Sequence, residues 1–285
     1  MKTITTSKQL QQTIDELRIR RRSIGLVPTM GFLHDGHLSL VRTAKLENDI
    51  VVTTIFVNPL QFSESEDLAT YPQDIERDTQ LASEAGTDFL FTPTHEEMFS
   101  ENVLTSISVT EISSALEGAS RPTHFAGVAT IVAKLFNIVG NCSAYFGEKD
   151  WQQLQVIKRM AIDLSYRVEV KGCPIVRDSD GLALSSRNVY LTKNQRSEAA
   201  NIPKTLIKAH EMIRDGERGP NNVKQAVLTH FERSPEIEVD YVELVNGETL
   251  QVTDQIDERT RLLVAVKIGT ARLIDNMNAL KGPSI

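Results

Sequence analysis

The sequence predicts an α/β protein, in which a Rossmann-like domain with a mostly parallel sheet precedes a smaller α+β domain. Through the first part of the chain, short β-prone runs alternate with helical segments, which favours a parallel sheet with helices on both faces. The run Ile50–Val57 is β-prone throughout, as expected of a strand buried on both faces. After about residue 176 the alternation stops. We therefore expect domains at residues 1–175 and 176–285, with a hinge near Gly172–Arg177.

The elements of the first domain follow from spacing and from stop signals. Ser7–Arg21 has helical spacing and a basic end, and Gly86 closes a polar-faced helix that begins at Pro72. The expected helices are Ser7–Arg21, Leu38–Glu47, Pro72–Ala85, Gly127–Val139 and Asp150–Leu164. The expected strands are Ile24–Val27, Ile50–Val57, Phe89–Phe91, Val103–Val109, Ala144–Phe146, Val168–Val170 and Pro174–Val176.

The second domain has a different pattern, in which helices come first and strands follow. Thr192–Arg214 and Asn221–Glu232 have helical spacing. Glu236–Leu244 and Arg261–Ile268 are strand-like, and the latter ends at Gly269. This order predicts a compact α+β module.

Composition narrows the class of protein. A chain of 285 residues with 40% hydrophobic and 24% charged residues is expected to fold around a packed core. The net charge of −7 argues against a nucleic-acid-binding protein, although it permits a local basic pocket. Cys142 and Cys173 form neither a metal motif nor a disulfide framework. The polar segment Met1–Arg22 does not resemble a secretory signal and no apolar run is long enough to span a membrane, so we expect a cytoplasmic protein.

The most informative segment, residues 27–38, contains His34 and His37 between an apolar run and an amphipathic one. In an open α/β sheet, such a junction lies at the carboxyl end of a strand, where ligands bind. A helix N-terminus there favours an anion, and two imidazoles could stabilise charge on a phosphate. Gly31 and Gly36 permit close approach of the backbone. The alternatives are a helix cap beside a surface histidine, or a two-histidine metal site for which no third ligand is recognisable.

Three further segments carry polar side chains at strand ends. Asn58 and Gln61 follow the second strand and could bind hydroxyl or carboxylate groups, although an Asn-Pro turn is common. Around residues 147–154, Lys149 could bind phosphate and Asp150 could be a helix N-cap. Residues 178–188 end in a hydroxyl-rich, cationic group that suits a polyphosphate, or they form an ordinary inter-domain loop. The loop at 121–128 favours a structural role.

Together, the order and spacing of these motifs resemble the pantothenate synthetase (pantoate–β-alanine ligase) family, within the nucleotidyltransferases that carry a His-x-Gly-His motif. The motifs are Pro-Thr-Met-Gly-x-Leu-His-x-Gly-His at 28–37, Phe-Val-Asn-Pro-x-Gln-Phe at 56–62, Gly-Glu-Lys-Asp-x-Gln-Gln-Leu at 147–154 and Asp-Gly-Leu-Ala-Leu-Ser-Ser-Arg-Asn at 180–188. The resemblance continues through residues 116–122 and through Ala-Arg-Leu-Ile-Asp-Asn at 271–276. The one departure is Trp151, where the family usually has Phe or Tyr.

The resemblance implies ATP-dependent ligation of pantoate and β-alanine through a pantoyl adenylate. It implies catalytic roles for His34, His37 and Lys149, and pantoate binding by Gln61 and Gln153, with Gln61 also bordering β-alanine. The implied ATP-binding residues are Met30, Gly31, Phe32, Leu33, His34, Asp35, Gly36, His37, Gly147, Glu148, Lys149, Asp150, Val176, Leu184, Ser185, Ser186 and Arg187.

The resemblance also implies Mg²⁺ brought by ATP, without a separate protein metal cage, and a homodimer. Two other functions stay open on the sequence alone. One is a different nucleotidyltransferase, against which the neutral pair Gln61 and Gln153 argues, because a second phosphorylated substrate would need more Arg and Lys. The other is a catalytically silent nucleotide-binding protein, against which the histidine pair and Lys149 argue.

Overall fold

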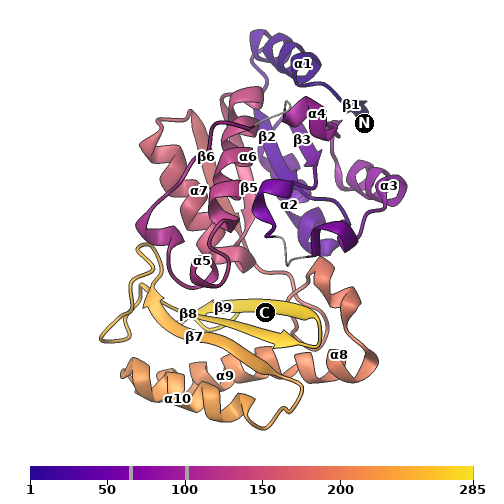
Figure 1. The fold of residues 1–285 in the computed structure, drawn as a ribbon. Coiled ribbons are helices and arrows are strands. Elements are labelled where there is room, and N and C mark those ends of the chain that lie inside the picture. Colours follow the sequence, from indigo (N-terminus) through magenta and orange to yellow (C-terminus); the bar gives the residue numbers. More distant parts are fainter. Residues whose placement is uncertain (64–66, 100–102, 285) are drawn as a thin grey trace. The chain divides into compact units, whose positions relative to one another are not determined.

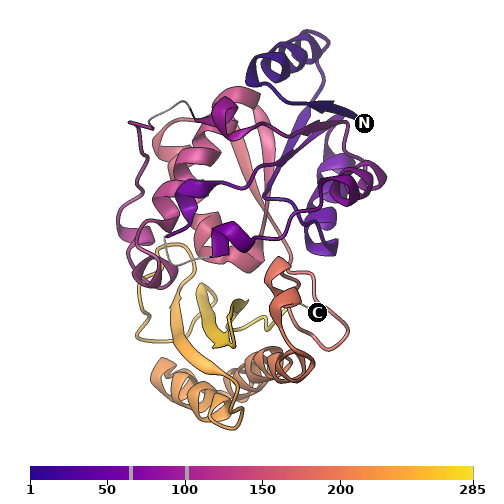
Figure 2. The same ribbon diagram turned by 45° about the vertical axis from the view of Figure 1, so that its right-hand side comes forward.

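The computed structural model describes residues 1–63, 67–99 and 103–284 (Figures 1 and 2). These form two compact units. The first holds residues 1–148 and 152–173, and the second holds residues 149–151 and 174–285. The first contains a six-stranded parallel sheet and the second a three-stranded antiparallel sheet, which confirms the predicted fold class.

The sheet of the first unit has the order β1-β4-β3-β2-β5-β6. Its strands are β1 (Lys2–Ile4), β2 (Ile24–Thr29), β3 (Ile50–Ile55), β4 (Phe89–Phe91), β5 (Cys142–Gly147) and β6 (Val168–Cys173). From β2 the chain proceeds through β3 to β4, and it then returns to place β5 on the other side of β2. This reversal creates a switch point between β2 and β5. In open α/β sheets, ligands bind outside the carboxyl ends of the strands at such a point.

Helices cover both faces of this sheet (Figures 1 and 2). The long helices are α1 (Ser7–Ile19), α2 (Asp35–Glu47), α3 (Ile75–Ala85), α6 (His124–Val139) and α7 (Trp151–Asp163), and the short ones are α4 (His95–Met98) and α5 (Glu117–Ser120). Helix α2 packs against α3, and α1 packs against α6. The apolar side of α2, with Leu38, Val41 and Ala44, meets Val27 of β2 and Val51 of β3 in one buried cluster. This packing fixes α2 beside the carboxyl end of β2.

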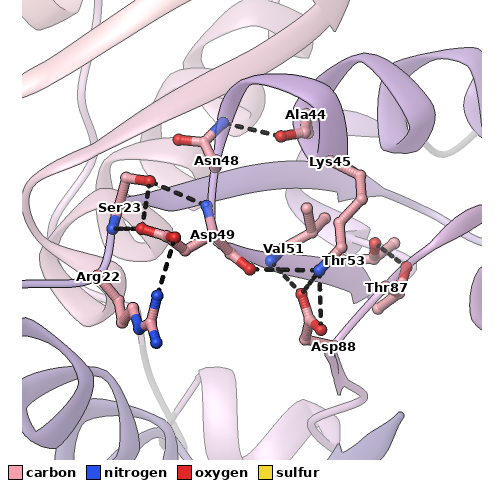
Figure 3. A network of polar contacts seen from close by, with 10 residues as sticks. All are labelled: Arg22, Ser23, Ala44, Lys45, Asn48, Asp49, Val51, Thr53, Thr87 and Asp88. Atoms are coloured by element: carbon pink, nitrogen blue, oxygen red, sulfur yellow. Dashed lines mark hydrogen bonds and ion pairs between the residues drawn. The ribbon is translucent and has the colours of Figure 1, made fainter. Parts of the chain in front are cut away.

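A polar network holds the opposite, amino-terminal ends of the central strands together (Figure 3). Asp49, just before β3, accepts hydrogen bonds from the backbone N–H of Ser23 at 2.9 Å and from its hydroxyl at 3.0 Å. Asp88, just before β4, accepts one from the N–H of Val51 at 2.8 Å and pairs with Lys45 at 2.8 Å. Each carboxylate therefore links the start of its own strand to a neighbouring strand and sets the register of the sheet.

The second unit packs two helices on an antiparallel sheet. Its elements are α8 (Lys193–Ala199), α9 (Asn201–Arg214), α10 (Pro220–Phe231), β7 (Glu238–Asn246), β8 (Thr260–Ile268) and β9 (Ala271–Asn278). The sheet order is β7-β8-β9. Leu206, Val227, Leu262 and Val264 lie in the shared core. The face of the sheet that packs against α9 and α10 is therefore apolar.

Two predicted strands are wrong. Residues 103–109 form no strand, because the N–H of Ile107 donates to the hydroxyl of Thr130 in α6 at 2.9 Å and Leu104 is 94% exposed. Pro174–Val176 also form none. Here the chain folds back on itself, so the carbonyl of Val176 accepts from the N–H of Leu184 at 3.0 Å.

The single helix predicted at Thr192–Arg214 is also wrong, since it is divided into α8 and α9 at Ala200. Pro203 has no N–H to donate to the carbonyl of Ala199, and its ring would clash there, so the helix is interrupted. Strands β1 and β9 were not predicted. The first has three residues, and the second contains the poor strand formers Asp275 and Asn276.

We expect Asp88→Ala to lower the free energy of unfolding by about 1–3 kcal/mol, because it leaves the buried N–H of Val51 without its acceptor. Asp15→Ala is the matched control. Asp15 is 70% exposed, and among the described residues its side chain pairs with Arg18 on its own helix, so the change should stay within about 0.5 kcal/mol. Urea unfolding followed by circular dichroism measures both. Equal effects would show that the strand-end network contributes no more than a surface ion pair.

Candidate active site

The loop after β2 carries the eight predicted residues 30–37 and enters α2 at Asp35. Its backbone takes the left-handed region twice, with φ of 84° at Gly31 and 49° at Phe32. A Cβ at Gly31 would also lie 3.0 Å from a carboxylate oxygen of Asp78, so only glycine fits easily. The tight turn brings the chain from the end of a strand directly into the first turn of a helix.

Asp78 of α3 holds this turn. Its carboxylate accepts hydrogen bonds from the N–H groups of Phe32 at 2.6 Å and Leu33 at 2.7 Å, and its side chain is only 1% exposed. Burial raises the pKa of Asp78, while the bonds from Leu33 and Phe32 act in the opposite direction. The motif analysis did not identify this residue, because it lies more than forty positions from the loop that it holds.

His34 and His37 form a pair at the N-terminus of α2. His34 is the N-cap, and its Nδ1 accepts from the N–H of Gly36 at 3.1 Å. His37 closes a capping box, because its Nδ1 accepts from the N–H of His34 at 3.4 Å, and the two ring centroids are 4.0 Å apart. A neutral ring whose Nδ1 accepts carries its proton on Nε2. Both imidazoles are therefore held as Nε2 donors beside a helix N-terminus that favours an anion.

The capping alternative from the sequence thus holds for His34, and it does not compete with a role in binding. The same bonds that cap α2 set the tautomer and the orientation of both rings. A group that is already oriented loses little freedom when it stabilises developing charge.

Gln61 ends a 3-10 turn, η1 (Pro59–Gln61), that follows β3. Its Nε2 lies 2.9 Å from the sulfur of Met30, and its Oε1 accepts from Nδ2 of Asn58 at 3.0 Å. Asn58 is 1% exposed, and its side chain also accepts from the N–H of Leu60 at 3.3 Å. The structure therefore brings Gln61 to the same sheet edge as the loop after β2, with its amide oriented by Asn58.

Helix α6 and the residues just before it pack against this turn. Nδ1 of His124 lies 2.9 Å from the carbonyl oxygen of Gln61, and Nη2 of Arg121 lies 3.4 Å from the same oxygen. Gly127 lets the turn approach the helix, because a Cβ there would lie 2.1 Å from the carbonyl oxygen of Leu60. The loop at 121–128 therefore has the structural role that its sequence favours, and that role is to position Gln61.

The end of β5 supplies Gly147 and Glu148, followed by α7 with the two glutamines of the third motif. Gln152 is buried, and the two N–H groups of its amide already have acceptors: Nε2 donates to the carbonyls of Ile112 and Ala115, both at 2.8 Å. Gln153 is half-buried and forms no side-chain hydrogen bond with the residues that the structure describes. Of the two, Gln153 is therefore the one available to a ligand.

The remaining predicted residues lie in the second unit. Lys149 and Ser185 line one small hollow, together with Asn188 and Asp275. Nζ of Lys149 lies 3.5 Å from a carboxylate oxygen of Asp150. Ser185 caps the 3-10 turn η5 (Ser186–Tyr190) by accepting from the N–H of Arg187 at 3.2 Å. Val176 and Leu184 are joined by the backbone bond described above.

One buried carboxylate in each unit already has partners of its own. Asp78 accepts two backbone N–H groups, and Asp275 forms an ion pair with Arg177 at 2.7 Å. In residues 1–63, 67–99 and 103–284, no group of three or more His, Cys, Asp or Glu side chains could hold a metal ion. Within the same ranges, no helix is both long and apolar enough to cross a membrane.

Comparisons with known proteins agree over nearly the full chain. The sequence profile of the pantoate-beta-alanine ligase family matches residues 2–278. A pantothenate synthetase from Sulfurihydrogenibium sp. (strain YO3AOP1) is 49% identical over 278 residues, which cover 97% of this chain and 99% of that protein. The crystal structure of pantothenate synthetase from Thermus thermophilus is 45% identical, with a TM-score of 0.93 over 98% of this chain and 99% of that one. The pantoate-beta-alanine ligase from Francisella tularensis, complexed with beta-gamma ATP and β-alanine, is 34% identical, with a TM-score of 0.81 and full coverage of both chains.

We expect Gly127→Ala to destabilise the protein by about 1–3 kcal/mol, because the added methyl group would overlap the backbone of Leu60 and displace η1. Gly147→Ala is the control, since its Cβ would have no other atom within 4 Å. Thermal unfolding of both variants measures the difference. If Gly127→Ala melts at the temperature of the control, the close approach of η1 to α6 does not constrain the fold.

Proposed function

This chain belongs to the pantoate-beta-alanine ligase family, and from that premise we propose that it joins pantoate to β-alanine at the expense of ATP, with the His34–His37 pair as its phosphate-stabilising centre. The family resemblance read from the sequence is confirmed. The observation that carries the catalytic assignment is the capping geometry of the two rings, which directs two Nε2 donors from the N-terminus of α2. Donors fixed before the reaction stabilise the charge that develops on a phosphate.

The proposed chemistry has two steps. The carboxylate oxygen of pantoate attacks the α-phosphorus of ATP, the bond to the β-phosphate oxygen breaks, and pyrophosphate leaves. The amine of β-alanine then attacks the carbonyl carbon of the pantoyl adenylate, loses a proton and expels AMP. Adenylation is needed because a free carboxylate has a poor leaving group. His34 and His37 act in the first step, where negative charge accumulates on the α-phosphate.

The proposal includes no covalent attack by a protein side chain, and the state of the two cysteines supports this choice. Burial raises the pKa of Cys142 to about 12 and that of Cys173 to about 11. Because the thiolate is the reactive form, both side chains are inert at neutral pH. This supports direct attack by the substrate carboxylate.

We assign pantoate to the amides of Gln61 and Gln153. Neutral amides can bind both the hydroxyls and the carboxylate of pantoate. The gem-dimethyl group of pantoate would contact Met30, which touches Gln61, and Phe62, which follows Gln61 in the chain. Gln61 also borders the approach of β-alanine in this assignment. Asn58 keeps the Gln61 amide in one orientation, which supports a role in selecting the substrate.

We assign the nucleotide to residues 30–37, Gly147 and Glu148 in the first unit, and to Asp150 and the predicted phosphate-binding residues in the second unit. Lys149, Ser185, Ser186 and Arg187 would hold the phosphates, and the backbone near Val176 and Leu184 would face the adenine. In this proposal residues 1–175 bind ATP and pantoate, and residues 176–285 act as a lid that contributes phosphate ligands.

Mg²⁺ fits this site only as a companion of the nucleotide. The buried carboxylates of Asp78 in the first unit and Asp275 in the second already have partners, so the phosphate oxygens would supply most of its ligands. When bound, the ion neutralises charge on the triphosphate. We further propose a cytoplasmic homodimer that acts on small molecules without nucleic acid or membrane.

His37→Ala should slow pantoate-dependent ATP–pyrophosphate exchange about 100- to 1,000-fold, because one preorganised donor to the developing phosphate charge is lost. The fold should survive, since α2 keeps the cap from His34 to the N–H of Gly36. His95→Ala, in the exposed first turn of α4, is the control and should exchange at the wild-type rate. Exchange by His37→Ala within about threefold of the control would contradict the assignment.

The adenylate route makes a separate prediction about atoms. When the carboxylate of pantoate is labelled with oxygen-18, one labelled oxygen should appear in AMP, because the oxygen that attacked the α-phosphorus leaves with it. Mass spectrometry of AMP, pyrophosphate and inorganic phosphate locates the label. Label in pyrophosphate or phosphate would indicate an acyl phosphate, and the role of the histidine pair would then be wrong.

A further inference from the structure

We propose that Asp275 and Asn276 of β9 are positioning residues, which set the distance between Lys149 and the Ser185–Arg187 turn. The inference rests on the proposed function, because it assumes that both groups bind the phosphates of ATP. All of the contacts that support it lie within the second unit.

Asn276 holds the backbone of Lys149. Its Nδ2 donates to the carbonyl oxygen of Lys149 at 2.9 Å, and its Oδ1 accepts from Nε of Arg261 at 2.6 Å. The residue is 2% exposed, so a lost hydrogen bond would not be replaced easily by water.

The far end of the same short segment is held separately. The guanidinium of Arg261 stacks on the ring of Trp151, 3.3 Å from its centroid, and Nε1 of Trp151 donates to the carbonyl of Gly247 at 2.7 Å. Arg261 therefore connects Asn276 to Trp151, and the three residues 149–151 are fixed at both ends.

Asp275 holds the other phosphate-binding group through Arg177. The two side chains form a bidentate ion pair at 2.7 and 2.9 Å, and both are almost fully buried. Nη1 of Arg177 also donates to the carbonyl of Gly181 at 3.0 Å, which fixes the turn that leads to Ser185. A bidentate pair fixes orientation as well as distance.

Adjacent residues of one strand thus anchor both groups. Oδ1 of Asp275 accepts from the N–H of Asn276 at 2.7 Å, which makes the dipeptide rigid, and Lys149, Ser185 and Asp275 line the same hollow. Buried Asp and Asn side chains are costly in a small sheet, where apolar residues would pack well. Positioning of the two groups explains why these side chains are in β9.

The first test is Asn276→Asp, which keeps an oxygen acceptor for Arg261 and removes the donor to Lys149. We expect kcat/KM for ATP in pantoate-dependent exchange to fall about tenfold. The reaction of preformed pantoyl adenylate with β-alanine should stay within about twofold of wild type, because the triphosphate is absent from that step. Asn278→Asp is the matched control: it lies on the same strand, its Nδ2 donates to the carbonyl of Glu258 at 2.9 Å, and it should retain wild-type exchange.

A double-mutant cycle separates positioning from stability and from the added charge. If Asn276 acts through Lys149, then Asn276→Asp should cost less than about twofold in a Lys149→Ala background. An equal penalty in both backgrounds, or equal loss in both half-reactions, would overturn the inference. If Asn276→Asp does not fold by circular dichroism, the neutral Asn276→Ser replaces it with the same expectations. Failure of the wild type to exchange at all would instead refute the proposed function.

Discussion

Two N–H groups of the loop after β2, those of Phe32 and Leu33, are held by one buried carboxylate, that of Asp78. The left-handed turn at Gly31 and Phe32 depends on this contact, together with the hydroxyl of Thr29, which accepts from the N–H of Gly31 at 3.2 Å. The entry angle of α2 depends on the turn, and the orientation of His34 and His37 depends on the first turn of α2. One buried side chain in α3 therefore determines where the imidazoles of His34 and His37 lie. Its burial is costly, and that cost is offset only while the loop keeps its shape.

The two edges of the sheet are built differently. At the amino-terminal edge, Asp49 and Asp88 use their oxygens on neighbouring strands and leave little capacity for a ligand. At the carboxyl-terminal edge, polar side chains are oriented by contacts within and between the loops, as the amide of Gln61 is by Asn58 and Met30. A rigid amino-terminal edge keeps the strands fixed, so that the loops at the opposite edge can hold their side chains in defined positions.

The sequence was sufficient for the fold class and for the residues that interact locally. The alternation of β-prone and helical segments predicted most of the elements. The spacing of His34 and His37 predicted that they lie together, because both residues cap the helix that they begin. Long-range partners were not readable. Asp78 has no local pattern that links it to residue 32, and β9 was missed because its buried Asp275 and Asn276 depress strand propensity. Val103–Val109 has the composition of a strand, but it pairs with no strand in the part of the chain that the structure describes, and composition alone cannot supply a partner.

Residues 149–151 belong to the second unit, although the chain on both sides of them belongs to the first. The two units are therefore not consecutive modules that could be inherited or exchanged by a single crossover in the gene. A fragment of this chain that holds only residues 174–285 contains Asp275 and Asn276 but lacks the segment that Asn276 holds. The hydrogen bond between residues 276 and 149 joins positions 127 apart. Because it ends on the backbone carbonyl of Lys149, it constrains where the tripeptide lies and not which side chain stands at position 149. The stacking of Arg261 on Trp151, by contrast, depends on the side chains at both ends, so a change at either of these positions must suit the other.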